Sequence, residues 1–272
     1  MTKYINPLTD FGFKRIFGNK EILKEFLNEL LPIKHKIAEI TFKNIEKLGT
    51  SEEDRKAIFD LSCIDDIGNE FIVELQRAKQ THFQDRALYY TTFPIQEQAQ
   101  RGSWNFKLTK IFFIGILDFS IEHFNDKEYL HHGQIIDINS KKVMSDKLNF
   151  IYIELTKFKK NHKELANELE KWIYILSNLS KLEDIPKELE GNQTIKNIFD
   201  IASYSKLNTQ DRDEYDRNLK VYRDLVNSLD TAKNDGKKEK AIEIAKNLLD
   251  VLDVKTIAKK TDLSIEEIEK LK

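Results

Sequence analysis

Two acidic side chains and one amide stand where a hairpin of two strands would bring them together. The segment IFDLSCIDDIGNEFIVELQ contains two apolar runs that join around Gly68. A hairpin centred on Ile67 places Asp60 opposite Glu74. Opposed residues of an antiparallel pair point to the same side, with Cβ atoms roughly 4.5–5.5 Å apart. Gln76 lies two residues beyond Glu74 and therefore on the same face.

Oxygen ligands of this kind suit a hard divalent cation. Two like charges opposed on a sheet are destabilising unless something compensates them. Mg²⁺ accepts one or two carboxylates, keeps several waters and takes further ligands from substrate phosphate, and Mn²⁺ suits the same oxygen donors. Such an ion would neutralise the charge that builds on phosphate oxygens during hydrolysis of a phosphodiester. We therefore expect Asp60 and Glu74 to hold Mg²⁺ or Mn²⁺, with Gln76 beside them.

The same alternation of polar residues is also typical of the solvent-facing side of a half-exposed hairpin. Ile64 and Ile72 share the face of Asp60, so the face is not purely polar. The spacing alone leaves both interpretations open. Other chemistries are unsupported, because the sequence lacks a GxSxG elbow, a Walker loop and histidines at metal spacing. Cys63 falls on the opposite face of the hairpin.

The composition favours a globular chain with one main core. The chain has 272 residues, of which 40% are hydrophobic and 10% aromatic, enough for one principal domain and an appendage. The net charge of -2 means that nucleic acid would have to be bound by clustered lysines.

A single cysteine excludes an internal disulfide and a Cys-rich zinc site. Without a signal peptide or membrane span, a soluble cytoplasmic protein without membrane contact is expected.

The first half of the chain alternates between helical and β patterns. Two short amphipathic helices are expected, one after Asp10 and one over EILKEFLNELL, which Asn19 can cap and Pro32 ends. Three runs then favour strands in a meander, beginning at Ile40, Ala57 and Glu70.

A longer helical segment follows from about Thr81 to Arg101, which Pro94 should kink or split. The nearly all-apolar run KIFFIGILDFSI suits a strand buried on both faces, and HHGQIIDI and NFIYIELTKF favour further strands. The predicted fold class is α/β with a mixed sheet.

The second half is helical, which suggests three parts: a core over 1–160, a helical extension over 161–232 and a helical tail over 233–272. The tail predicts a helix, a short helix over VKTIAKK, a turn, and a final helix from Ser264 with Glu267 completing a capping box. This outline resembles a helix-turn-helix. Glutamates in the final helix would be repelled by DNA, which favours a protein contact such as self-association. Better phosphate contacts in the tail are Lys237, Lys238 and Lys240.

The hairpin and its surroundings resemble a known nuclease fold. An Asp, a hairpin and a Glu-x-Gln strand, followed by a helix and another strand, resemble the PD-(D/E)XK restriction-endonuclease-like core. More specifically, TDFGFKRIFGNKEILKEFLNELLP, DLSCIDDIGNEFIVELQ and RALYYTTFPIQEQAQRG resemble, in this order, the Rpn family of recombination-promoting nucleases and putative transposases. The resemblance is good over the N-terminal part of the chain and looser over the tail.

The resemblance implies roles for particular residues. Asp60 and Glu74 match the metal ligands of the family, and Gln76 matches its glutamine variant of the catalytic lysine. The glutamine departs from the wider superfamily, because a neutral amide can only coordinate or hydrogen-bond. A second positive group is therefore expected near the site.

Four residues are candidates for contact with DNA phosphate. Arg86 and Lys79 lie just past the Glu-x-Gln strand, and Tyr90 shares the helical face of Arg86. Lys14 and Asp10 match the opening motif of the family. Simpler alternatives are a solvated strand end for Lys79, packing for Tyr90 and an N-cap for Asp10.

The resemblance implies a Mg²⁺-dependent DNA endonuclease that hydrolyses phosphodiester bonds. Its expected setting is recombination, mobile-element activity or phage defence, its partner is DNA, and a homodimer is the oligomeric state that analogy suggests. The alternative is a nuclease-like module that binds DNA or protein without cutting. Close convergence of the Asp60 and Glu74 carboxylates would favour the enzyme.

Overall fold

The chain divides into two units, Met1–Leu219 and Lys220–Lys272. The computed structural model describes residues 2–32, 35–43, 46–47, 57–99, 105–122, 124 and 126–271. Strands and helices alternate in the first half of the chain, and the second half is helical. The expected division at residues 160 and 232 stays a prediction.

A six-stranded mixed sheet forms the centre of the first unit, with the order β1-β4-β5-β6-β8-β7. Its strands are β1 (Ile40–Phe42), β4 (Leu61–Asp65), β5 (Glu70–Gln76), β6 (Ile111–Leu117), β7 (Leu130–Ile136) and β8 (Val143–Glu154). Parallel pairing joins β5 to β6 and β6 to β8, whereas the other pairs are antiparallel. Two short strands, β2 (Glu46–Lys47) and β3 (Ala57–Ile58), pair with each other. The predicted α/β fold class and the meander of β1, β4 and β5 are confirmed.

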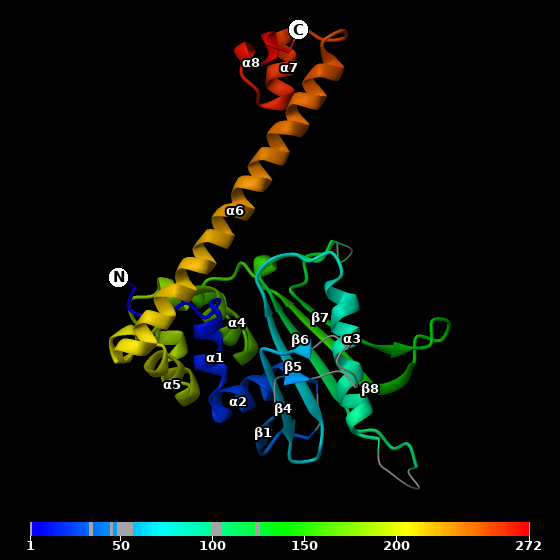
Figure 1. The fold of residues 1–272 in the computed structure, drawn as a ribbon, viewed down its shortest axis with the longest axis vertical. Coiled ribbons are helices and arrows are strands. Elements are labelled where there is room, and N and C mark those ends of the chain that lie inside the picture. The colour runs from blue at the N-terminus through cyan, green and yellow to red at the C-terminus, as the bar shows by residue number, and fades with distance from the viewer. Residues whose placement is uncertain are drawn as a thin grey trace. The chain divides into compact units, whose positions relative to one another are not determined.

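Helices cover both faces of the sheet (Figure 1). They are α1 (Asp10–Phe17), α2 (Lys20–Leu30), α3 (Phe83–Glu97), α4 (Glu168–Asn178) and α5 (Gln193–Ile201). Short 3-10 turns over Leu155–Lys157, His162–Glu164, Leu179–Lys181, Lys187–Leu189 and Tyr204–Lys206 join the later elements. Figure 1 shows α3 on one face of the sheet and α1, α2 and α4 on the other.

Local capping fixes where the first two helices begin. Asn19 caps α2 as predicted, accepting from the backbone N–H groups of Glu21 and Ile22. The expectation that Asp10 caps α1 is wrong. Thr9 is the N-cap, and its Oγ1 accepts from Gly12 N at 3.0 Å. The hydroxyl of Thr9 already satisfies this donor, so Asp10 is the first helical residue and its carboxylate is left to other contacts.

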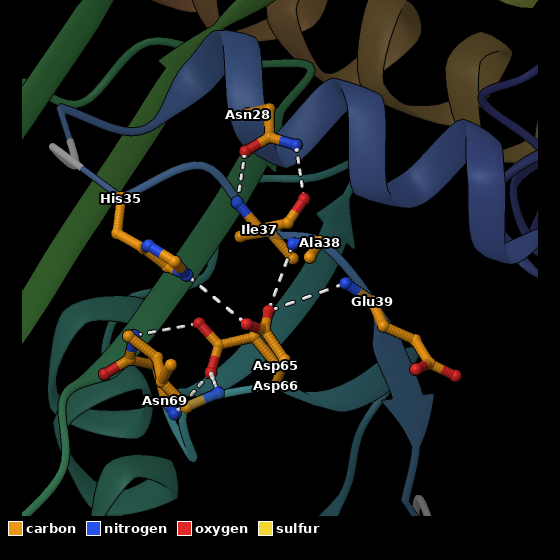
Figure 2. A network of polar contacts seen from close by, with 9 residues as sticks. Asn28, His35, Ile37, Ala38, Glu39, Asp65, Asp66 and Asn69 are labelled. Atoms are coloured by element: carbon orange, nitrogen blue, oxygen red, sulfur yellow. Dashed lines mark hydrogen bonds and ion pairs between the residues drawn. The ribbon is translucent and has the colours of Figure 1, made fainter.

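The turn between β4 and β5 sets the register of the hairpin (Figure 2). Asp65 Oδ1 accepts from the backbone of Ile67 at 3.1 Å and of Asn69 at 2.7 Å, and Oδ2 accepts from Asn69 Nδ2 at 2.8 Å. Gly68 adopts a φ of +86°, which glycine reaches without a steric penalty. The hairpin is therefore centred on Ile67, as predicted.

The same turn is tied to the chain before β1. Asp66 Oδ1 accepts from Ala38 N at 3.0 Å, and its Oδ2 lies 3.3 Å from His35 Nε2. Asn28 of α2 bonds both the N–H and the C=O of Ile37. Figure 2 shows how these contacts join α2, the segment before β1 and the hairpin turn.

Asp65→Ala is expected to lower the free energy of unfolding by about 2 kcal/mol, because it leaves buried donors of the turn without an acceptor. Urea unfolding measures the effect. The matched control is Asp137→Ala, which removes a similar bond to Ser140 N in the exposed turn between β7 and β8 and should cost less than about 1 kcal/mol. Equal losses would mean that burial of the Asp65 turn contributes nothing.

Close packing of α3 on the sheet places its side chains over β5 and β6. Phe83 and Ala87 belong to a buried cluster with Ile72 and Phe113. A Cβ on Gly115 would meet Phe83 Cζ at 3.1 Å, which explains a glycine in the middle of a buried strand. The helix continues through Pro94 rather than being split there, and the predicted end at Arg101 lies outside the described residues.

On the opposite face, aromatic rings join the helices to each other. Trp172 of α4 is buried against Phe17 at 6.4 Å and Phe26 at 5.5 Å between ring centroids. These contacts hold α1 in place through its neighbour α2, which matters because α1 carries Lys14.

The C-terminal unit is made of helices only. The sequence suggests separate helical segments around Lys233, but α6 (Thr209–Leu248) is one helix of 40 residues. It is followed by α7 (Val254–Thr261) and α8 (Ile265–Glu269), and the end of α6 shares a small core with them. The capping box of Ser264 and Glu267 is confirmed.

Two tail lysines that were expected to contact phosphate have carboxylate partners instead. Lys238 lies 3.0 Å from Glu267, and Lys240 lies 2.8 Å from Glu243. These pairs weaken the case for a phosphate contact through the tail. Within the described residues, no helix is both long and apolar enough to span a membrane.

Candidate active site

The hairpin register brings Asp60, Glu74 and Gln76 to one place. Leu61 pairs with Val73, and the same register carried one residue further places Asp60 opposite Glu74. Glu74 and Gln76 lie in the last part of β5, beside Gly115 and Leu117 of β6. The three side chains therefore meet near the carboxyl end of a central strand.

Hydrogen bonds fix the orientation of both carboxylates. Asp60 donates its backbone N–H to Glu74 Oε1 at 3.1 Å, and Asp60 Oδ2 accepts from Leu75 N at 2.7 Å. Gln76 Nε2 donates to Glu74 Oε2 at 3.2 Å. Only 4% of the Glu74 surface is exposed. Glu74 is therefore not the solvent-facing residue that simple alternation would allow, and its carboxylate is held against the backbone of Asp60.

Burial raises the pKa values of both Asp60 and Glu74. Burial raises the pKa of Glu74 to about 8, and the negative charge of Asp60 adds to the shift. Burial also raises the pKa of Asp60, although the bond from Leu75 N opposes this. Two carboxylates held this close favour a proton or a cation between them. Strong shifts of this kind are typical of functional sites.

Three basic side chains act on this pair. Lys14 of α1 and Arg77 both oppose the rise in the pKa of Asp60, and Arg86 of α3 opposes that of Glu74. Lys14 Nζ also lies 3.0 Å from a carboxylate oxygen of Asp10, and the negative charge of Asp10 raises the pKa of Asp60. Lys14 and Arg86, both expected from the sequence, act on the two acids from different elements, and their roles as phosphate contacts stay predictions.

Arg77 is a residue that sequence reasoning missed. It directly follows Gln76 at the end of β5, and its charge acts on Asp60. The available signal was its place one residue past the Glu-x-Gln strand. Strict alternation would send it to the opposite face, and the end of the strand at Gln76 removes that restriction.

The guanidinium of Arg86 has hydrogen-bond donors without acceptors. It lies over the rings of Phe83 and Tyr90, 5.6 and 5.8 Å from their centroids. Its Nη1 donates to Gln80 Oε1, whereas the buried Nε and Nη2 have no hydrogen-bond partner in the described part of the chain. Buried donors without acceptors are costly. A phosphate oxygen would satisfy both, because the planar fork of arginine matches such groups.

Tyr90 lies beside the acids, and Lys79 does not. Burial raises the pKa of the Tyr90 hydroxyl, and the charge of Glu74 contributes to the shift. The Tyr90 ring also packs edge-on against Phe59, at 5.1 Å between centroids. Lys79 is half-exposed and pairs with Glu122, at a cavity of about 130 Å³ lined by α3 and the segment after β6. Its simpler interpretation, a solvated strand end, fits this place.

The donor set fits a hard divalent cation with two protein carboxylates. Within the described residues, no group of three or more His, Cys, Asp or Glu side chains could hold a metal. Asp60 and Glu74 would therefore need further oxygen ligands from Gln76, water or substrate, which is how Mg²⁺ is commonly bound. Burial, and then the charge of Asp60, raise the pKa of Glu74 to about 8, and a bound cation would oppose both effects by stabilising the ionised carboxylate.

Comparison with known proteins gave one family. A family model described as PD-(D/E)XK nuclease family transposase matches residues 7–232. The match includes the whole sheet and the residues around Asp60 and Glu74. Searches of curated proteins and of solved structures gave no match.

Proposed function

The chain belongs to the PD-(D/E)XK nuclease family transposases, and from this premise we propose that it is a metal-dependent endonuclease that hydrolyses DNA phosphodiester bonds. The family itself supports a nuclease-like function. The observation that carries the finer proposal is the buried carboxylate of Glu74, bonded to the backbone N–H of Asp60, together with the effects of Lys14, Arg77 and Arg86 on the pKa values of these two acids.

In this proposal, Asp60 and Glu74 hold Mg²⁺ or Mn²⁺, and Gln76 lies next to them as a neutral ligand or hydrogen-bonding group. The ion would supply Lewis-acid stabilisation of the charge that develops on the phosphate oxygens. The backbone bonds from Leu75 and Asp60 pre-orient the two carboxylates, so little reorganisation is needed when substrate binds.

The surrounding side chains bind and orient the phosphate. Arg86 directs Nε and Nη2 toward non-bridging oxygens, which replaces the missing partners of these donors. Lys14 and Arg77 add positive charge near Asp60. Because Gln76 is neutral, these three residues supply the charge that a lysine at its position would give.

The biological setting is also part of the proposal. Membership of a transposase family favours recombination or mobile-element activity on DNA, and phage defence is a related setting. Action as a homodimer is a further expectation that follows from the resemblance, and a cytoplasmic location is one that follows from the sequence.

Plasmid nicking tests the proposal. Purified protein is expected to nick supercoiled DNA with Mg²⁺ or Mn²⁺ and to stop when EDTA is added. Asp60→Ala, purified in parallel, should be inactive, whereas Glu128→Gln, at an exposed position outside the site, should cut like wild type. Absence of cutting by wild type, or cutting that Asp60→Ala does not affect, would favour a nuclease-like module that binds DNA without cutting it.

A further inference from the structure

The outer end of the β7–β8 hairpin, residues 135–145, forms an arm beyond the regular part of the sheet. Gln134 pairs with Asn149, but the next pairs are Ile135 with Ser145 and Ile136 with Val143, so the register shifts at this point. Irregularities of this kind bend and twist a strand. In Figure 1 the arm is the green loop that extends past α3.

The arm exposes apolar side chains where a soluble hairpin would carry polar ones. Ile138, at the turn, is 76% exposed, and Met144 is 71% exposed. Ile135, Ile136 and Val143 are also exposed. An exposed apolar group on one short segment marks an interaction surface. No packing within the first unit accounts for it among the described residues.

The arm has a net charge of +1, because Lys141 and Lys142 outnumber Asp137. Lys141 and Lys142 are exposed at the turn. Asp137 accepts from Ser140 N at 2.6 Å, and Asp146, just beyond the arm, lies 2.7 Å from Lys110. Asp137 is bound to the backbone of its own turn, and Lys141 and Lys142 are the exposed side chains beside the apolar tip that can contact an anion.

We propose that this arm binds the minor groove of duplex DNA, with Ile138 as an apolar wedge and Lys141 and Lys142 on the flanking phosphates. Apolar side chains inserted at base steps, with basic residues beside them, are the usual chemistry of minor-groove binding by proteins. The two exposed lysines, Lys141 and Lys142, favour DNA over a second protein as the partner of the arm, because they can contact phosphate. The inference rests on the proposed function, since it takes DNA as the substrate.

The position of the arm fits a duplex that also reaches the active site. Tyr152 of β8 is level with Glu74 through Gly115. From Tyr152 to Val143, β8 extends about 30 Å at roughly 3.3 Å per residue. This length is close to one turn of B-DNA, about 34–36 Å. The arm would thus contact the minor groove about one helical turn from the phosphate that is cut.

Binding measurements on the full chain test the arm separately from cutting. In an Asp60→Asn background, fluorescence anisotropy follows binding to an AT-rich duplex of about 30 base pairs and to a single strand of equal length across a range of salt. Lys141→Ser with Lys142→Ser should reduce the slope of log K against log salt by about 1.8, at roughly 0.9 per phosphate contact. Lys181→Ser with Lys187→Ser, an exposed pair elsewhere, should leave the slope unchanged.

The apolar tip has its own test. Ile138→Ser should weaken binding to the duplex about tenfold, without changing the salt slope or the binding to single-stranded DNA. A minor-groove ligand such as netropsin should abolish the difference between Ile138→Ser and the parent. Shortening the duplex to leave fewer than about ten base pairs on either side of its centre should do the same.

Different results separate this inference from the proposed nuclease activity. If the arm variants bind DNA like their parent while Asp60→Asn still abolishes nicking, the arm proposal fails and the nuclease stands. If wild type never cuts but the arm variants bind more weakly, the arm stands and the nuclease fails. If the arm variants change the sedimentation of the protein but not its DNA binding, the arm binds a second copy of the chain and the proposal is overturned.

Discussion

Glu74→Gln should abolish cutting and, at alkaline pH, make the metal-free protein more stable than wild type. The loss of cutting follows from removal of one of two carboxylates that hold the ion, and a fall of at least about 10³-fold is expected. The gain in stability follows from burial, because Glu74 is 4% exposed and lies against Asp60. An amide of the same shape carries no charge to desolvate.

The sign of the pH effect follows from the direction of the pKa shift. The ordinary pKa of 4.5 for Glu74 rises to about 8 in the folded protein. Between these values the folded state binds more protons than the unfolded state, so the free energy of unfolding falls as pH rises from 4.5 toward 8. The wild type should therefore lose on the order of 5 kcal/mol over this window, at about 1.36 kcal/mol for each pH unit, and Glu74→Gln should not.

Thermal unfolding in EDTA at pH 5.5 and pH 9 measures this difference. The melting temperatures of wild type and Glu74→Gln should be similar at pH 5.5, and the variant should be higher at pH 9. Glu128→Gln, at an exposed position, should show no such difference. Mg²⁺ at pH 9 should raise the melting temperature of wild type but not of Glu74→Gln. A variant that is less stable than wild type at both pH values would contradict the burial argument.

The part of the site that could be predicted is the part built by local chemistry. The turn at Asp65, Gly68 and Asn69 centres the hairpin, and period-2 alternation then places Asp60, Glu74 and Gln76 on one face. The capping of α2 by Asn19 is equally local. Each of these features depends on residues only a few positions apart.

The parts that could not be predicted depend on tertiary packing. Periodicity does not show that α1 brings Lys14 to Asp60, because this requires α1 to be held by α2 and α4. It does not show burial either, so the hairpin alone left the solvent-facing interpretation of Glu74 open. The sequence suggests a division of the helical part of the chain at residue 233, whereas α6 continues past this point and through Gly236, since one glycine costs a helix only about 1 kcal/mol.

The second large effect is expected for Arg86→Lys, which should lower kcat about 10²–10³-fold and change KM little. Lysine keeps the positive charge but lacks the planar guanidinium group. It therefore lacks the Nε and Nη2 donors, which have no hydrogen-bond partner in the described part of the chain. Removing one preorganised donor to a developing charge has an effect of this size. A loss confined to kcat means that the contact strengthens in the transition state.

Steady-state nicking kinetics, together with DNA binding in EDTA, separate this role from a structural one. Arg86→Lys should bind DNA like wild type and retain its melting temperature to within a few degrees, since the aliphatic stem still packs on Phe83 and Tyr90. Lys79→Ser is the matched control, because Lys79 lies just before α3 but pairs with Glu122 rather than with the acids. It should change kcat by less than about twofold, as expected for an exposed ion pair. If Lys79→Ser cut as poorly as Arg86→Lys, the phosphate would have to lie along the loop after β5, and the unpaired donors of Arg86 would need another explanation.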